Sequence, residues 1–135
     1  MPTTRTITLT GRPPVTITEE TWPVIATASD DCHDGQVECQ ANRRSKWAVR
    51  VRQHADGRAI VYATYSYSSN WQGARGYAAK RGIMLPAASS AATICTAIRD
   101  VCADIAEAES QGGDAERWPT LAAECIADMP AETID

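Results

Sequence analysis

Polar and apolar positions alternate most clearly between residues 46 and 67, where two runs rich in Val, Ala and Tyr flank an Asp-Gly pair. Alternation with a period of two is typical of a strand that is buried on one side. Asp-Gly between two such runs is a strong turn signal. The pattern predicts a β-hairpin at 46–67, and we expect the other elements to be organised around it.

The register of this hairpin follows from the length of its loop. A two-residue loop at Asp56 and Gly57 would pair Val51 with Tyr62 and leave Val61 among the arginines. A three-residue loop with a left-handed Gly57 pairs Val51 with Val61 and gathers the apolar side chains on one face. We predict the second register, because a slip of one residue would turn the whole apolar set toward solvent.

The two faces of the predicted hairpin differ in chemistry. The apolar face carries Trp47, Val49, Val51, Val61, Ala63, Tyr65 and Tyr67. The opposite face carries Arg50, Arg52, His54, Arg58, Ile60 and Tyr62. Arg50 lies directly opposite Tyr62 in this register, which predicts a cation–π contact between them. We expect Arg50 and Arg52 to face solvent.

The N-terminal pattern predicts short strands at 6–10 and 15–17, where Thr alternates with aliphatic residues. Thr18 to Thr21 then supplies a capping hydroxyl and two acids, and Pro23 follows within the first turn. These are typical helix-start signals, so we predict an early helix near 19–28. An edge strand around Gln36 to Gln40 is a further expectation.

The chain after the hairpin changes from strand to helix character. Residues 68–82 contain three glycines and no clear period, which predicts a surface loop before a brief strand at Ile83–Leu85. From Ser90 the apolar positions follow a 3.6-residue stripe up to Gly112, which predicts a helix. Asp114 is the expected cap of a second helix, whose apolar side begins at Trp118.

Together these elements predict an α+β fold. A small antiparallel sheet is centred on the 46–67 hairpin, with one early helix and a C-terminal antiparallel helix pair packed on the sheet. We predict a single domain over 1–135, sheet-rich at 1–85 and helical at 86–135. The composition agrees with this, since 44% hydrophobic and 22% charged residues are ordinary for a globular protein.

The net charge of −4 conceals a strong asymmetry along the chain. Residues 43–81 hold nine of the thirteen basic residues and one acid, Asp56, whereas the remainder holds four basic and sixteen acidic residues. Such a basic segment suits a polyanion or an acidic protein surface as partner. The alternative, that it neutralises the protein's own acidic segments, remains open.

The residue types that bind phosphates, bases and protein hot spots gather in this same segment. The predicted partner-binding residues are Arg43, Arg44, Lys46, Arg50, Arg52, Arg58, Tyr62, Trp71, Arg75, Tyr77, Lys80 and Arg81.

Catalytic and metal signatures are weak by comparison. Cys32, His33 and Cys39 form the best metal candidate, extended by His54, but their spacing matches none of the common zinc patterns. No nucleophile–base pair or phosphate-binding glycine motif is evident. The sequence therefore predicts a non-enzymatic protein without metal or cofactor. A metal-dependent enzyme built on Cys32, His33 and Cys39 is the competing hypothesis.

The cellular setting is predicted from cysteine usage and from a resemblance. Five cysteines without a compact framework fit a reducing cytoplasm, and no signal peptide or membrane-length apolar run is evident. Residues 10–15, 22–26 and 52–58 resemble small, mostly uncharacterised proteins of bacterial prophages, plasmids and integrative elements. Small cytoplasmic proteins of such elements commonly antagonise host defence, and anti-CRISPR proteins are one such class.

Because anti-CRISPR proteins share no common fold or site, the resemblance assigns no functional residue. It implies stoichiometric binding to a host protein or ribonucleoprotein complex, as an anti-CRISPR-type inhibitor. The alternative is a nucleic-acid-binding accessory protein that contacts DNA or RNA through residues 43–81. Neither hypothesis involves a membrane.

Overall fold

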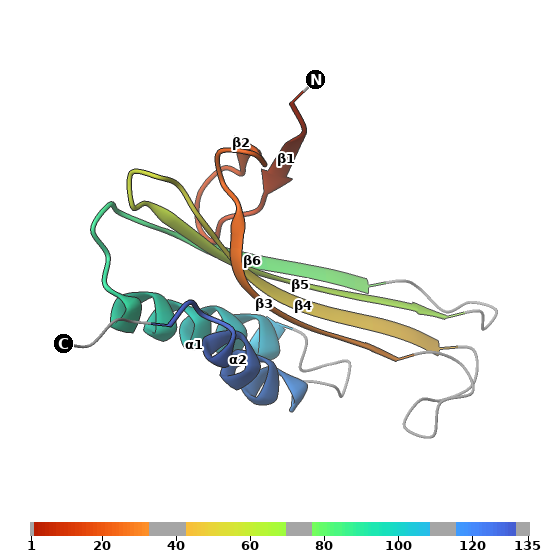
Figure 1. Ribbon diagram of the computed structural model, residues 1–135. Helices are drawn as coiled ribbons and strands as arrows, with labels where there is room; N and C mark the ends of the chain where they lie inside the picture. The colour runs from red at the N-terminus through yellow and green to blue at the C-terminus, as the bar shows by residue number, and fades with distance from the viewer. Residues whose placement is uncertain (1, 33–42, 70–76, 109–115, 132–135) are drawn as a thin grey trace.

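Six strands and two helices follow one another in the computed structural model, which describes residues 2–32, 43–69, 77–108 and 116–131 (Figure 1). Their bounds are β1 Thr4–Ile7, β2 Val15–Thr18, β3 Val24–Cys32, β4 Arg43–Gln53, β5 Ala59–Ser69, β6 Tyr77–Leu85, α1 Ala91–Ala108 and α2 Arg117–Ala127. One antiparallel sheet has the order β3-β4-β5-β6, and β1 and β2 form a separate hairpin. The predicted α+β class is confirmed.

The predicted hairpin forms the two inner strands of the larger sheet. Val51 pairs with Val61 and Trp47 with Tyr65, as the three-residue loop requires. Gly57 has φ of +95°, a conformation that favours glycine. The register is confirmed, although β4 and β5 extend beyond 46–67 to 43–69.

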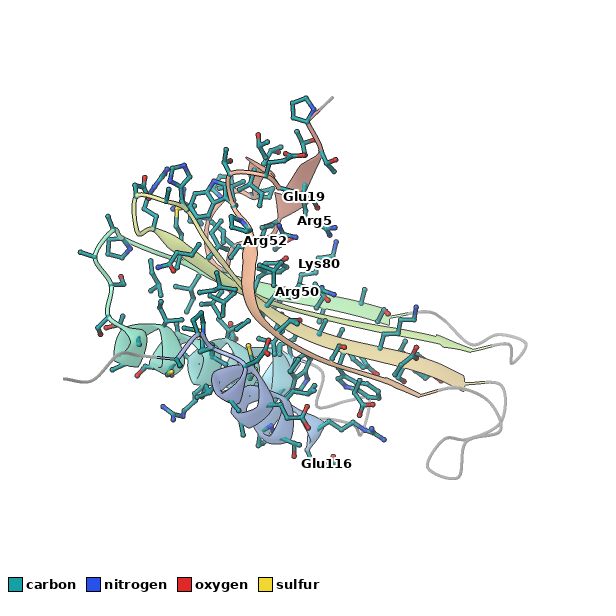
Figure 2. All side chains as sticks on the ribbon, viewed as in Figure 1. Arg5, Glu19, Arg50, Arg52, Lys80 and Glu116 are labelled. Carbon is teal, nitrogen blue, oxygen red and sulfur yellow. The ribbon has the colours of Figure 1, made fainter. Side chains whose placement is uncertain are left out.

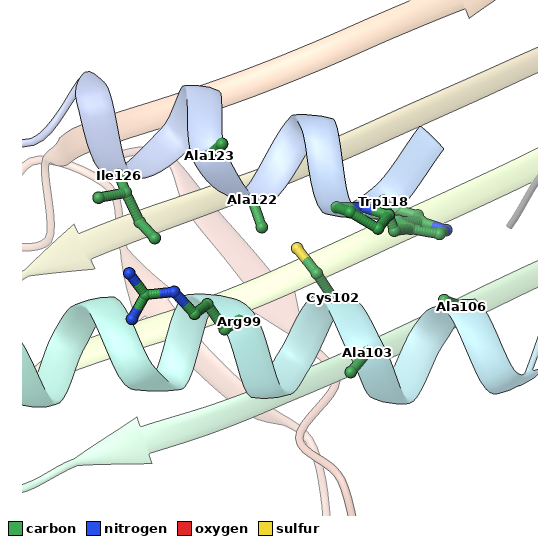
Figure 3. Close-up of a pocket in the computed structure, with 9 residues that line it drawn as sticks. Arg99, Cys102, Ala103, Ala106, Trp118, Ala122, Ala123 and Ile126 are labelled. Carbon is green, nitrogen blue, oxygen red and sulfur yellow. The ribbon is translucent and has the colours of Figure 1, made fainter. Parts of the chain in front are cut away.

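The main core lies between this sheet and the two helices. Val49, Val51 and Val61 are fully buried on the inner sheet face, where they join Ile98 and Trp118 of the helices in one cluster. The 3.6-residue stripe of α1 faces the sheet, as the sequence predicts. Along the groove that they form, α1 and α2 run in opposite directions, which confirms the predicted antiparallel helix pair (Figure 3).

The predicted early helix near 19–28 is wrong, because residues 24–32 form the edge strand β3. This strand pairs with β4, and Thr27 lies opposite Arg50. Residues 18–22 form a tight turn in which the backbone N–H groups of Thr21 and Trp22 donate to the carbonyl of Thr18. Pairing with β4 outweighs the local helix-start signals, because it buries Ala26 and Ala28 in the core.

Strand β6 is longer than the predicted strand at Ile83–Leu85. It begins at Tyr77 and pairs with β5 over nine residues, so the second half of the expected loop at 68–82 is strand. The middle of that loop, residues 70–76, lies outside the described residues, as does the predicted edge strand around Gln36 to Gln40.

A smaller core joins the β1–β2 hairpin to one end of the outer sheet face. It consists of Ile7, Leu9, Ile17, Trp22, Ile60 and Tyr62. In Figure 1 this hairpin stands on the side of the sheet opposite the helices. Residues 8–10 cross β6 at Gly82, where the Thr10 N–H donates to the Gly82 carbonyl at 2.8 Å.

Both edge strands of the larger sheet are engaged by other parts of the chain. The N–H of Thr27 on β3 donates to the Asp128 carboxylate, which follows α2, at 2.9 Å. On β6, the N–H of Gly82 donates to the Thr10 hydroxyl at 3.2 Å. Each edge is therefore interrupted at one point by a bond from outside the sheet.

Truncation of the inner face tests the core. Val51→Ala or Val61→Ala should each lower the free energy of unfolding by about 1–3 kcal/mol, because both side chains are fully buried. Val24→Ala is the matched control, since Val24 is 41% exposed, and it should change stability by less than about 0.5 kcal/mol. Urea denaturation measures both; equal effects would contradict the assignment of faces.

Gly82 should tolerate no side chain. A Cβ atom at this position would lie 2.5 Å from the Thr8 carbonyl oxygen and 3.2 Å from Tyr62 Cβ. Gly82→Ala should therefore destabilise the protein by roughly 1–3 kcal/mol through overpacking. Lys80→Ala, on the same strand and face, is the control for thermal unfolding, and an unchanged melting temperature in Gly82→Ala would refute the close crossing.

Candidate functional site: the open face of the sheet

The outer face of the larger sheet is covered at one end and uncovered at the other. Its side chains form cross-strand rows, and the row of Thr27, Arg50, Tyr62 and Gly82 borders the β1–β2 hairpin. Two further rows that span all four strands lie beyond it. We define the open face as Ser29, Asp31, Lys46, Ala48, Arg50, Thr64, Ser66, Ala78 and Lys80, the outward-pointing residues among the twelve that line a hollow of about 610 Å³. Asp30, Trp47 and Tyr65, which belong to the opposite face, also line this hollow.

Three cations dominate the open face. Lys46 and Lys80 are exposed and Arg50 is half-buried. Figure 2 shows Arg50 and Lys80 on the side of the sheet that faces away from the helices. Within the described ranges, none of the three forms a side-chain hydrogen bond or an ion pair. With Asp31 as the one acid among the nine residues, this face attracts anionic groups.

The floor between the cations consists of small side chains. Ser29, Ala48, Thr64, Ser66 and Ala78 occupy alternate strand positions that point outward. Trp47 and Tyr65 belong to the opposite face, where they are buried in the main core. None of the nine outward-pointing residues of the open face is aromatic, so a partner's backbone can approach its small side chains closely.

The expectation that Arg52 faces solvent is wrong. This side chain belongs to the covered end, and the residue is only 6% exposed. Its Nε donates to the Tyr62 hydroxyl at 2.8 Å and its Nη1 donates to the Trp22 carbonyl at 3.0 Å. Strand alternation placed Arg52 on the correct face, but the cover comes from residues far away in sequence.

A carboxylate shared between two arginines completes this contact. Glu19 Oε1 lies 3.7 Å from Arg52 Nη2 and 2.6 Å from Arg5 Nε. The hydrogen bond to Glu19 raises the pKa of Arg5 above its usual value. Figure 2 shows Arg5, Glu19 and Arg52 near the base of the β1–β2 hairpin. We call Arg5, Glu19, Arg52 and Tyr62 the hairpin clamp.

Arg58 and Arg81, two other predicted site residues, lie outside the open face. Arg58 forms an ion pair with Asp56 at 2.7 Å, and its guanidinium lies 5.0 Å from the centre of the Trp22 ring. Arg81 Nε lies 3.5 Å from an Asp104 carboxylate oxygen on α1. Both side chains serve contacts within the chain.

The remaining predicted site residues are described in part or not at all. Tyr62 lies opposite Arg50 as predicted, but Tyr62 is buried. Among the described residues, the guanidinium that contacts Tyr62 is that of Arg52. For Arg43, Arg44 and Tyr77 the backbone alone is described, in β4 and β6. Trp71 and Arg75 lie outside the described residues.

The described cysteines occupy core or near-core positions on the helices. Burial raises the pKa of Cys102 to about 12 and that of Cys125 to about 11. Both thiols are therefore protonated at neutral pH and are weak nucleophiles. Among the described residues, no three His, Cys, Asp or Glu side chains lie close enough to share a metal ion. Of the predicted metal candidate, the Cys32 side chain, His33 and Cys39 lie outside that part of the chain.

A second hollow, of about 450 Å³, lies between α1 and α2 (Figure 3). It is lined by Arg99, Cys102, Ala103, Ala106, Trp118, Pro119, Ala122, Ala123 and Ile126. This groove is apolar except for Arg99, so it offers shape but little specific chemistry. The open face, by contrast, combines three cations with hydroxyl groups.

Comparison of the chain with protein-family models, with curated proteins and with solved structures finds no match. Within the described residues, neither helix has the length and apolar character needed to cross a membrane. The site must therefore be interpreted from its own chemistry.

The hairpin clamp predicts a large loss of stability on replacing Arg52 and a small loss on replacing Arg50. Arg52→Met should lower the free energy of unfolding by about 2–4 kcal/mol, because it leaves Tyr62 and Glu19 without their buried partner. Arg50→Met, two positions away on the same face, should lower it by less than about 1 kcal/mol. Chemical denaturation of the two variants decides this, and equal losses of stability would show that the clamp is not structural.

Proposed function

We propose that the protein is a non-enzymatic binding protein, and that its open face docks onto an acidic surface of another protein. The arrangement of Lys46, Arg50 and Lys80 carries this proposal. The three cations surround a floor of small side chains, and within the described residues none of them forms an ion pair with a carboxylate; the one acid of the face, Asp31, lies opposite Lys46. An acidic partner would supply the missing counter-charges.

The chemistry of the floor favours a protein over a single-stranded nucleic acid. Proteins that bind single strands usually stack bases on exposed aromatic rings. On the described outer face Tyr62 is buried, and the floor residues are Ser, Thr and Ala. A flat floor of this kind suits a helix or strand of a partner protein, whose acidic side chains reach the surrounding cations.

We further propose that the partner is a bacterial host complex and that binding inhibits it, in the manner of an anti-CRISPR protein. The resemblance of residues 10–15, 22–26 and 52–58 to proteins of mobile elements supports this setting. Such a protein would act in the cytoplasm as a stoichiometric inhibitor, and it would need a binding surface rather than a catalytic centre.

Charge reversal on the two sides of the molecule tests the proposal. Tagged wild-type protein and the variants Lys46→Glu, Lys80→Glu and Arg99→Glu are used to capture partners from a nuclease-treated bacterial lysate. Lys46→Glu and Lys80→Glu should each abolish capture of a specific protein, because they reverse a charge on the open face. Arg99→Glu is the matched control, since Arg99 is an exposed cation on α1, and it should capture as wild type does.

Two outcomes would contradict the proposal. Equal capture by all four proteins would show that the open face is not the docking surface. Capture from an untreated lysate that is lost from the nuclease-treated one would identify the protein as a nucleic-acid-binding accessory protein. In that case, affinity for a labelled oligonucleotide should fall linearly with salt on a log–log plot.

A further inference from the structure

Arg50 occupies a distinctive place on the open face, at the corner between the sheet and the β1–β2 hairpin. Resting on the function proposed above, we propose that Arg50 is the anchor residue of this surface. It receives the carboxylate of one Asp or Glu side chain of the partner protein, while Lys46 and Lys80 contact other acidic groups.

Arg50 is more buried than the two lysines of the open face. It is half-buried in the middle of β4, whereas Lys46 and Lys80 are exposed. Its row is the last one before the hairpin, and both Tyr62 and Gly82 in that row are buried. A partly desolvated charge interacts more strongly with an opposite charge than an exposed one does. A carboxylate bound at this corner would therefore contribute more than one bound at either lysine.

The acceptors around Arg50 already have donors within the chain. Glu19 is shared by Arg5 at 2.6 Å and Arg52 at 3.7 Å. The Tyr62 hydroxyl receives the Arg52 Nε hydrogen bond at 2.8 Å. Asp31 lies on β3 two side-chain rows beyond Thr27, about 13 Å along the strand. Among the described residues, the hairpin clamp therefore satisfies Arg52 and leaves the Arg50 guanidinium for an external ligand.

The guanidinium of Arg50 determines which kind of ligand can bind at the corner. A guanidinium presents a planar set of donors that matches a carboxylate with two parallel hydrogen bonds. Strand geometry places the Cα atoms of Arg50, Lys46 and Lys80 roughly 12–14 Å from one another. At that spacing each cation can pair with a separate acidic group of the partner, and one of these groups enters the corner at Arg50.

The test uses the full chain, with a fluorescein-labelled octaglutamate peptide as probe at low ionic strength. Arg50→Lys keeps the charge but removes the planar donor set, and it should weaken binding about tenfold, in the range of charged hydrogen bonds. Lys46→Gln and Lys80→Gln each remove a full charge, yet they should weaken binding less. Fluorescence anisotropy gives the three affinities, and thermal unfolding checks that the variants are folded.

The outcomes separate this inference from the proposed function. If Lys46→Gln and Lys80→Gln weaken binding and Arg50→Lys does not, the anchor is refuted and the open face stands as the docking surface. If no variant changes the affinity, both proposals fail. Tighter binding of a single-stranded oligonucleotide, with the same dependence on Arg50, would refute the carboxylate ligand.

If the Arg50→Lys variant unfolds, an NMR measurement on the wild-type protein tests the proposal directly. In the wild-type protein, the Nε–Hε resonance of Arg50 should shift on addition of the octaglutamate peptide, because a carboxylate then hydrogen-bonds to the guanidinium. If the Arg50 resonance does not shift when the peptide is saturating, the proposal is overturned. The Arg52 resonance is the internal reference, since its guanidinium is already engaged by Tyr62 and Trp22.

Discussion

The buried guanidinium of Arg52 is the interaction on which the arrangement of the outer face depends. A charge removed from water is stable only when its donors and its charge are compensated. Here Tyr62 and Trp22 accept hydrogen bonds from Arg52, and Glu19 supplies a counter-charge at 3.7 Å. Tyr62 comes from β5, whereas Trp22 and Glu19 both come from the turn between β2 and β3. The N-terminal hairpin is consequently fixed over one end of the sheet, and the other end is left to form the open face.

The two faces of the sheet are therefore covered and stabilised in different ways. The inner face packs against α1 and α2 at the main core, and its stability comes from apolar contact between Val, Ile and Trp side chains. The outer face is covered at one end by the smaller core, and the buried guanidinium of Arg52 lies beside this core. The close crossing at Gly82 permits this cover, because a larger residue would keep residues 8–10 away from β6.

The hairpin register and the helix stripes could be predicted from the sequence because both arise from local periodicity. Pairing Val51 with Val61 follows from the turn and from alternation alone. The strand at Val24–Cys32 could not be predicted in this way, because its helix-start signals are local while its pairing partners are 13 to 28 residues away. The burial of Arg52 also depends on a distant segment. Of the candidate site, alternation indicated Arg50 and the basic segment indicated Lys46 and Lys80, but the small floor residues carry no sequence signal beyond their size.

The bonds at Thr27 and Gly82 have a consequence for how the protein behaves at high concentration. A sheet edge with free backbone groups can pair with the edge of another molecule, which is a common origin of aggregation. Here Asp128 occupies a donor on β3 and Thr10 occupies a donor and an acceptor on β6. Each bond interrupts the row of groups that an incoming strand would need. The chain can thus expose a broad, flat sheet surface while resisting growth into fibres from its sides.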